Sequence, residues 1–238
     1  MKNIIIFLLF FTSVISFSQE ITGDELLEKA IEFHDPNGHW QTFEGELFVT
    51  METPKNTPRK SRIRINLPEQ YFFVKAVRDT IITEFAVHKE DCSIAINGNT
   101  NPSEELKKKH NLSCKRAKFM KNYYTYLYGL PMKLKDEGTI IHQKVEKKTF
   151  KGKAYFVLKA TYNQQVGKNT WYFYFDPKTF AMEVYQFFKD ETKKDGEYIL
   201  LSGLETINTI KMPKNRAWYF NKDNVYLGTD ILSKNAQN

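Results

Sequence analysis

Apolar and polar residues alternate with a period of two through most of this chain, and no other feature restricts the fold as strongly. Apolar side chains take every second position over 47–51 and again over 63–67. This pattern is typical of antiparallel strands that bury one face. Further strands are expected over 71–77, 81–88, 93–96, 139–150, 154–163, 170–176, 181–189, 198–201, 205–211, 217–221 and 226–232. The chain is therefore predicted to be mostly β-sheet.

Helices are expected at two places where the alternation is interrupted. Thr22 and Glu25 have the spacing of a capping box, and apolar residues of one helix face follow over 26–31. Between Pro102 and Pro131 the sequence predicts a helical insert, whose second helix is expected over 115–128. These helices are the only segments available to cover a face of the sheet.

The predicted sheet is too wide to stay flat and open. About twelve strands at a spacing of about 4.8 Å make a sheet more than ~50 Å wide. Helices that are each about 10 Å across cannot cover one face of it, and twisted sheets of this width curl, split or close. The expected fold is mainly β (α+β): a large curved antiparallel sheet forming a half-open barrel, with an N-terminal helix and a helical insert as lid. A β-sandwich is the alternative.

The first residues have the layout of a cleavable signal peptide over 1–18. An unbroken apolar run covers 4–11, and Ser16 and Ser18 place small residues at positions −3 and −1 before Gln19. The run is shorter than the roughly 20 residues that span a bilayer. We expect cleavage near Ser18-Gln19, a periplasmic or secreted protein that is not an integral membrane protein, and one β-rich domain over 19–238. A buried helix or a short anchor is the alternative reading.

Two cysteines, Cys92 and Cys114, are present. In an oxidising compartment such a pair usually forms a disulfide. In the chain-entropy model, closing a loop of about 20 residues stabilises a fold by on the order of 3 kcal/mol. No histidine accompanies either cysteine at the spacing of a zinc site. We expect a disulfide that fastens the helical insert to the preceding strand.

The basic residues are scattered, although the formal net charge is +7. The only run of three covers 107–109, whereas nucleic-acid-binding proteins gather such residues on one element. The charge is therefore interpreted as an aid to solubility, and no nucleic-acid partner is expected.

No motif for a cofactor, a metal or a catalytic site is recognised. The sequence lacks a Gly-rich phosphate loop, a zinc-protease helix and a nucleophile elbow. His34, Asp35 and His39 could be read as metal ligands, but Pro36 and Gly38 between them favour a turn that ends the helix. The acidic residues Asp176 and Asp136-Glu137 also stand in turns. We expect no enzyme, no cofactor and no metal, and an enzyme of unrecognised type stays as a further alternative.

Aromatic residues, 15% of the chain, gather over 123–128 and 171–175. Over 171–175 both faces of the expected strand are aromatic, and a row of solvent-exposed rings is unfavourable. The helices could bury the second face, or the rings could line a ligand cavity. The residues expected to form the wall of such a cavity are Tyr123, Tyr124, Tyr128, Trp171 and Tyr174.

Three segments carry a resemblance to known proteins: KNYYTYLYGLPMKL at 121–134, GKNTWYFYFDP at 167–177 and GEYILL at 196–201. They resemble blocks of an uncharacterised family of secreted bacterial proteins, which has no assigned activity. The strand–DPKT–strand hairpin, the N-terminal helix and the helical insert are also similar to the LolA-like group of periplasmic lipoprotein carriers. That resemblance implies a half-open barrel that holds acyl chains under its helices.

The leading hypothesis is a non-enzymatic periplasmic or secreted protein that binds an apolar or amphiphilic ligand, such as a lipid or an acylated peptide. Desolvation of apolar surface would drive binding, at about 25 cal/mol per Å². The alternative is an interaction module with a filled core, whose aromatic patch docks a cell-envelope protein.

Overall fold

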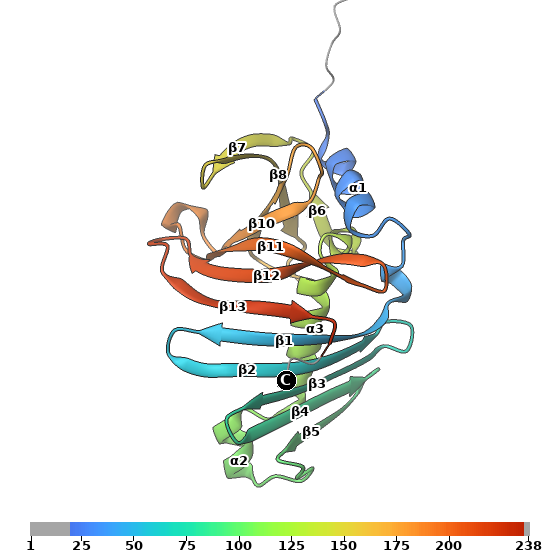
Figure 1. Cartoon of the computed structure of the whole chain (residues 1–238), viewed down its shortest axis with the longest axis vertical. Coiled ribbons are helices and arrows are strands. Elements are labelled where there is room, and N and C mark those ends of the chain that lie inside the picture. The colour runs from blue at the N-terminus through green and yellow to red at the C-terminus, as the bar shows by residue number, and fades with distance from the viewer. Residues whose placement is uncertain (1–19, 236–238) are drawn as a thin grey trace, which may run out of the picture.

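The computed structural model describes residues 20–235, and its strands form one antiparallel sheet (Figure 1). The strands are β1 (Glu44–Thr53), β2 (Asn56–Asn66), β3 (Tyr71–Arg78), β4 (Ile81–His88), β5 (Asp91–Ile96), β6 (Thr139–Ile141), β7 (Glu146–Phe150), β8 (Lys153–Tyr162), β9 (Thr170–Phe175), β10 (Met182–Phe188), β11 (Glu197–Ile207), β12 (Ile210–Phe220) and β13 (Tyr226–Ser233). The helices are α1 (Gly23–His34), α2 (Glu104–His110) and α3 (Cys114–Gly129).

The C-terminal strand joins two halves of the sheet. The strand order is β5-β4-β3-β2-β1-β13-β12-β11-β10-β9-β8-β6, and β7 pairs with β8 beside this path. Within each half, neighbours in sequence are mostly neighbours in space, whereas the pairing of β1 with β13 connects the two ends of the chain. The edge strands β5 and β6 are not paired with each other, so the sheet stays open.

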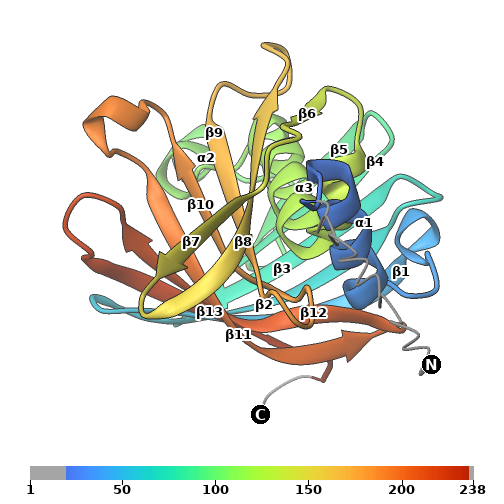
Figure 2. The same ribbon diagram turned by 90° about the horizontal axis from the view of Figure 1, so that it is seen from above.

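The sheet curves around α3, which lies on its concave side with α1 at the edge of the same side (Figure 2). This arrangement confirms the expected half-open barrel with helices on its concave side. The alternative of a β-sandwich is wrong, because all the described strands belong to one continuous sheet. No helix of the described residues is long and apolar enough to cross a membrane. The expected signal peptide lies outside the described residues.

Each helix begins where a side chain can cap it. At α1 the Thr22 side chain accepts a hydrogen bond from the backbone N–H of Glu25, and the Glu25 side chain accepts one from the N–H of Thr22. This is the capping box that the sequence predicts. Ser103 and Ser113 cap α2 and α3 by accepting hydrogen bonds from the N–H groups of Leu106 and Arg116.

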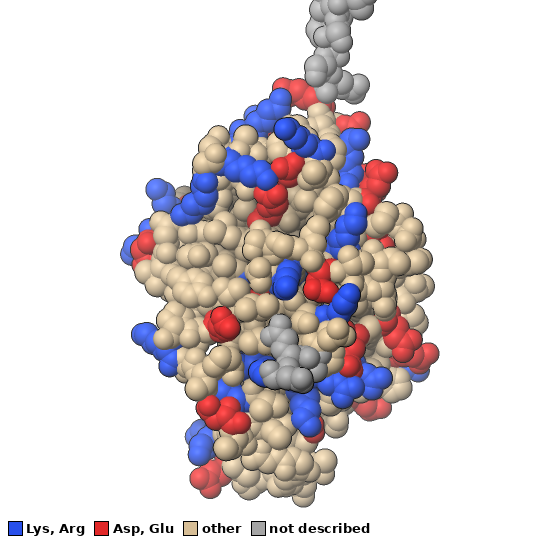
Figure 3. Space-filling view, viewed as in Figure 1, with Lys and Arg blue, Asp and Glu red and all other residues tan. Residues whose placement is uncertain are grey.

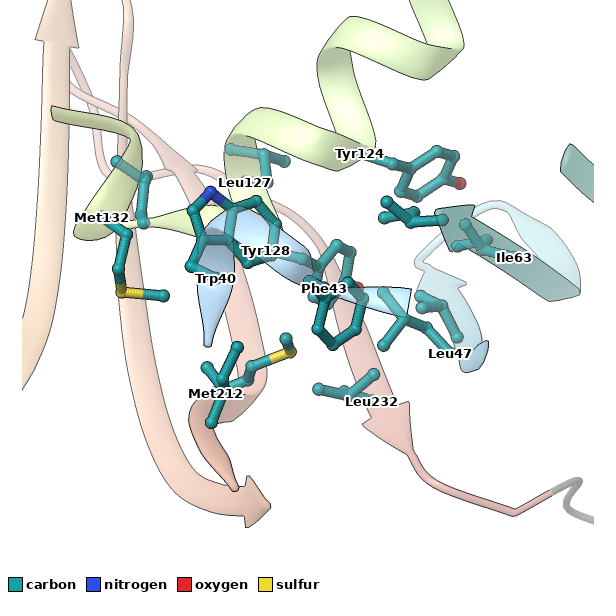
Figure 4. Close-up of a cluster of buried hydrophobic side chains, with 14 of the residues drawn as sticks. Trp40, Phe43, Leu47, Ile63, Tyr124, Leu127, Tyr128, Met132, Met212 and Leu232 are labelled. Carbon is teal, nitrogen blue, oxygen red and sulfur yellow. The ribbon is translucent and has the colours of Figure 1, made fainter. Parts of the chain in front are cut away.

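The core fills the space between α3 and the concave face. Figure 4 shows rings and aliphatic side chains from helix and sheet in contact there. Tyr124 and Tyr128 of α3 pack against this core, where Leu47, Ile63 and Leu232 of the sheet have no exposed surface. Burial of apolar surface on both elements therefore holds α3 in the barrel.

The disulfide between Cys92 and Cys114 is present, with a Cα–Cα distance of 5.7 Å. Cys92 lies in β5 and Cys114 is the first residue of α3. The bridge therefore ties the start of the helix to the edge strand of the sheet, which confirms the prediction.

Two strand predictions were wrong because each runs across a break between two strands. The expected strand over 139–150 is divided into β6 and β7, and the strand expected over 205–211 is the end of β11, a turn and the start of β12. Asn208 and Thr209 form this turn with φ values of 49° and 70°. Positive φ at both central residues is what a two-residue hairpin needs. The sequence pattern did not predict this turn, because Thr209 is β-branched and such residues rarely adopt a positive φ.

Candidate functional site

An open groove runs along one side of α3, at the edge of the core. It has a volume of about 640 Å³ and lies between α3, the β2–β3 turn and the β8–β9 connection. Its aromatic lining consists of Phe119, Tyr123, Tyr126, Tyr162 and Trp171. We call this site the α3 groove.

Helical spacing explains why α3 contributes three of these rings. Residues 119, 123 and 126 are separated by four and three positions, so they share one helix face. The rings of Phe119 and Tyr123 are stacked with a centroid distance of 6.0 Å. Phe119 is 52% exposed, so the outer end of this wall is open to solvent.

The opposite wall is built around Trp171 at the start of β9. Its ring meets Tyr126 edge-on with a centroid distance of 5.7 Å, and it lies 4.9 Å from Phe187 of β10. These contacts hold the indole in place while part of it lines the groove. Aromatic pairs of this geometry contribute about 0.5–1.5 kcal/mol beyond the area that they bury.

Two of the tyrosines that line the groove contact each other through their hydroxyl groups. The hydroxyls of Tyr126 and Tyr162 are hydrogen-bonded to each other. Burial raises the pKa of Tyr126 well above its usual value and raises the pKa of Tyr162 to about 12. Both phenols are therefore neutral near pH 7, and the aromatic lining carries no charge.

Lysines stand at the rim of the groove. Lys133 is paired with Asp136, and Lys121 donates a hydrogen bond of 3.3 Å to the carbonyl oxygen of Gln70. Lys168 has no ion pair or side-chain hydrogen bond with any described residue. Three lysines and one aspartate line the groove, so an anionic or zwitterionic group would be attracted to its rim.

The outer face of the sheet differs from this site. Figure 3 shows basic and acidic side chains interspersed over it, and many are paired, as Arg62 and Arg64 are with Glu46. Such exposed pairs contribute little to stability.

A second set of polar groups lies buried behind α3. Arg216 of β12 is 1% exposed and donates hydrogen bonds to the carbonyl oxygens of Pro213, at 2.7 Å, and Leu127, at 3.4 Å. Asp230 pairs with Arg216 in the strand register and accepts a hydrogen bond from the indole of Trp218. Burial raises the pKa of Asp230, against the lowering effect of Arg216.

Sequence reasoning missed this polar set, although a signal was present. Arg216 in β12 and Asp230 in β13 both point into the fold. Apolar residues usually occupy the inward positions of strands in which burial alternates. A charged residue at such a position is informative, since it needs partners inside the fold.

The structure brings together two of the five residues that were expected to form a ligand wall. Tyr123 and Trp171 line the α3 groove. Tyr124 and Tyr128 lie on the other side of α3, where each is 2% exposed and packed in the core. Tyr174 belongs to a separate cluster on the opposite face of the sheet, with Tyr155, Val157 and Val184. Tyr126 and Tyr162 complete the groove without having been expected there.

Asp35 has a structural role in the turn that follows α1. The carboxylate of Asp35 accepts hydrogen bonds from the backbone N–H groups of His39, at 2.9 Å, and Trp40, at 2.8 Å. The interpretation of this segment as a turn is therefore confirmed. Among residues 20–235, no group of three or more His, Cys, Asp and Glu side chains is placed to hold a metal ion.

The open, curved sheet with a helix on its concave side defines a half-barrel of the LolA type. The chain is similar to a LolA superfamily protein of Nitrosomonas europaea, with 12% sequence identity, 92% of this chain and 96% of that chain covered, and a TM-score of 0.53. It is also similar to a DUF1329 family protein of Desulfovibrio piger, with 9% identity, 90% and 92% of the two chains covered, and a TM-score of 0.51. At these identities the likeness extends to the fold alone.

The sequence defines the particular family. The chain belongs to a family of unknown function, DUF6503, whose model matches residues 2–235. No curated protein matches the sequence. The expected resemblance to an uncharacterised family, and the second one to LolA-like proteins, are both confirmed.

Proposed function

We propose that this protein binds an apolar or amphiphilic ligand, such as a lipid or the acyl chain of a lipoprotein, in the α3 groove, without catalysing a reaction. The observation that carries the proposal is an uncharged aromatic groove of about 640 Å³ that is open to solvent and rimmed by lysines. Ligand sites for small molecules commonly have volumes of about 300–1,000 Å³ and a mostly apolar lining.

The energetics of the groove favour an alkyl chain. Each methylene group that moves from water into an apolar site contributes about 0.8 kcal/mol. The rings of Tyr126 and Trp171 are held by contacts with their neighbours, so little ordering would oppose binding. The lysines at the rim would keep a polar head group in water while the chain lies against the rings.

The fold gives further support. The LolA-like lipoprotein carriers that the sequence resembles hold acyl chains under helices of a half-open barrel, and the α3 groove lies beside a helix in such a barrel. A periplasmic or secreted location fits the disulfide between Cys92 and Cys114, because such bonds persist in oxidising compartments.

Binding of a single-chain lipid to the mature chain tests the proposal. We would titrate lysomyristoylphosphatidylcholine below its micelle concentration and follow binding by native mass spectrometry. Val166→Trp is the blocking variant, because Val166 lines the groove and is 58% exposed, so a larger side chain there fills the groove without disturbing the core. Binding should weaken at least tenfold.

Tyr172→Ala provides the matched control, since Tyr172 is the neighbour of Trp171 in β9 and its side chain lies on the opposite face. It should bind the lipid as the unchanged protein does. Absence of binding to the unchanged protein, or equal binding by the blocked variant, would refute the proposal.

Docking of a cell-envelope protein is the second candidate for this site. Phe119 and Val166 are more than half exposed at 52% and 58%, and the core beneath α3 is filled. If the protein from its native envelope carries no lipid but co-purifies with a protein partner whose capture Val166→Trp abolishes, this second function is favoured.

A further inference from the structure

A pair of arginines faces a second cavity on the concave side, far along the sheet from the α3 groove. Arg59 lies in β2 and Arg78 is the last residue of β3. The two strands are antiparallel, and the last pairs of their register are Ser61 with Ala76 and Lys60 with Val77. One step further along the ladder, Arg59 and Arg78 are direct neighbours across the two strands.

The cavity beside this pair has a volume of about 240 Å³. Its lining includes Arg59, Arg78, Asp79, Thr83 and His110, the last residue of α2. It shares no lining residue with the α3 groove. The site is therefore separate from the one that carries the proposed function.

Both guanidinium groups have a buried N–H donor without a partner. The Nε atoms of Arg59 and Arg78 are buried and have no hydrogen-bond partner among the described residues. Arg59 donates one hydrogen bond, from Nη2 to the hydroxyl of Tyr124 at 3.2 Å. The guanidinium of Arg78 makes no hydrogen bond or ion pair with any residue of the part that the structure describes. Buried donors of this kind normally have a partner, and a missing one points to a water molecule or a ligand.

Nearby acids balance only part of the charge of the pair. Asp79 lines the cavity but forms no ion pair with either arginine. Asp230 is two strands away from Arg59, since both residues pair with Met51 of β1, and Arg216 lies next to it in β12. Along this row of the sheet, three arginines accompany one aspartate. The free protein therefore holds an excess of positive charge along this row. Like charges on neighbouring strands are destabilising.

We propose that this cavity binds a phosphate group, held between the guanidinium groups of Arg59 and Arg78 with the imidazole of His110 and the hydroxyl of Thr83 as further donors. Guanidinium groups present planar sets of donors that match phosphate oxygens. A carboxylate has only two oxygens and is satisfied by one such group, whereas a phosphate has enough oxygens for both. Inorganic phosphate and the head group of a phospholipid share this chemistry, and the experiment separates them.

The experiment measures phosphate binding to the mature chain by calorimetry and by the shift in thermal midpoint, at constant ionic strength set with sodium chloride. Arg78→Gln is the main variant, because its guanidinium makes no contact that the fold needs. Without ligand it should be at least as stable as the unchanged protein, since a repulsion is removed. Its affinity for phosphate should fall about tenfold or more, the effect expected for losing charge-assisted hydrogen bonds.

Arg64→Gln is the matched control. It removes the same charge from β2, the strand of Arg59, on the opposite, exposed face, and it should bind phosphate as the unchanged protein does. Arg59→Gln should weaken binding like Arg78→Gln. A phosphate effect of equal size in all variants would indicate general screening and would overturn the proposal.

A second titration with dihexanoylphosphatidic acid, which is monomeric in water, identifies the source of the group. If it binds in an Arg78-dependent way and inorganic phosphate does not, the proposal stands and the group belongs to a lipid. If both bind in this way, free phosphate suffices. If neither binds, the proposal is wrong, whereas the proposed function in the α3 groove is unaffected because its test uses another cavity.

Discussion

The guanidinium of Arg216 lies over the ring of Tyr128, with its Cζ atom 4.1 Å from the centroid of the ring. Arg216 belongs to β12 and Tyr128 to α3, so this contact connects the sheet to the helix that lines the candidate ligand groove. The same guanidinium donates to the carbonyl oxygen of Leu127 in α3. The position of α3 therefore depends on a buried cation as well as on apolar packing.

Replacing Arg216 by leucine should destabilise the protein by on the order of 3 kcal/mol. The variant loses the hydrogen bonds to Pro213 and Leu127 and leaves Asp230 buried without its neighbouring cation. Urea denaturation measures the change in the free energy of unfolding. Arg64→Leu, on the exposed face, should change it by no more than about 0.5 kcal/mol. A similar small change for both variants would contradict this account of α3.

Stability should fall between pH 6.5 and pH 4 because of His34. Its Nδ1 atom lies 2.6 Å from the carbonyl oxygen of Lys211, and its Nε2 atom accepts a hydrogen bond of 3.0 Å from the N–H of Met182. Burial lowers the pKa of His34 from 6.5 to about 4. The unfolded chain thus takes up a proton at a higher pH than the folded protein. The stabilisation is complete above pH 6.5 and is lost by about pH 4, a change of up to about 3 kcal/mol.

His34→Gln is the variant that isolates this effect. It should be less stable at pH 7, because a glutamine does not reproduce both hydrogen bonds, but its stability should depend much less on pH between 6.5 and 4. The measurement is the free energy of unfolding in urea at several pH values. An unchanged slope in the variant would assign the acid sensitivity to other groups.

Removing the disulfide should cost on the order of 3 kcal/mol. The bond joins residues 22 positions apart, and the unfolded chain gains freedom when this loop is released. The double variant Cys92→Ala/Cys114→Ala should unfold at lower urea concentration and should be cleaved faster by trypsin at Lys107 to Lys109 in α2. Reductant should reproduce this loss in the unchanged protein and have no effect on the variant; sensitivity of the variant to reductant would count against the explanation.

The hydroxyl groups of Tyr126 and Tyr162 should show coupled contributions to stability. Each single change to phenylalanine leaves the other hydroxyl without its partner in a largely buried place, at a cost of about 1–2 kcal/mol. The double change removes both groups and should cost less than the sum of the single changes, by about 1 kcal/mol. Urea unfolding of the four proteins measures this difference, and strictly additive values would mean that the hydroxyls act independently.

Much of the fold could be predicted because strand and helix signals are local. The alternation over 71–77 corresponds to β3 (Tyr71–Arg78), and the capping box at Thr22 begins α1. The half-open barrel followed from comparing the width of the sheet with the size of the helices. The hairpin at Asn208-Thr209 escaped because its conformation is unusual for a β-branched residue.

The candidate site could be predicted only in part. Aromatic density identified Tyr123 and Trp171, which line the α3 groove. Tyr174 was grouped with them because it lies in the same aromatic strand, but it points to the opposite face, with Tyr155 and Val184. Alternation states which residues of a strand share a face, but it does not state which face is concave.

By itself, the sequence determined most of the strands, most helix boundaries, the pairing of Cys92 with Cys114 and the need for a curved sheet, because these depend on neighbouring residues and on the size of the elements. Only the tertiary structure decided that Tyr126 meets Trp171 and that Arg59 stands beside Arg78. Such contacts depend on strand register and on the position of α3 against the sheet, and the packing of the whole core sets both.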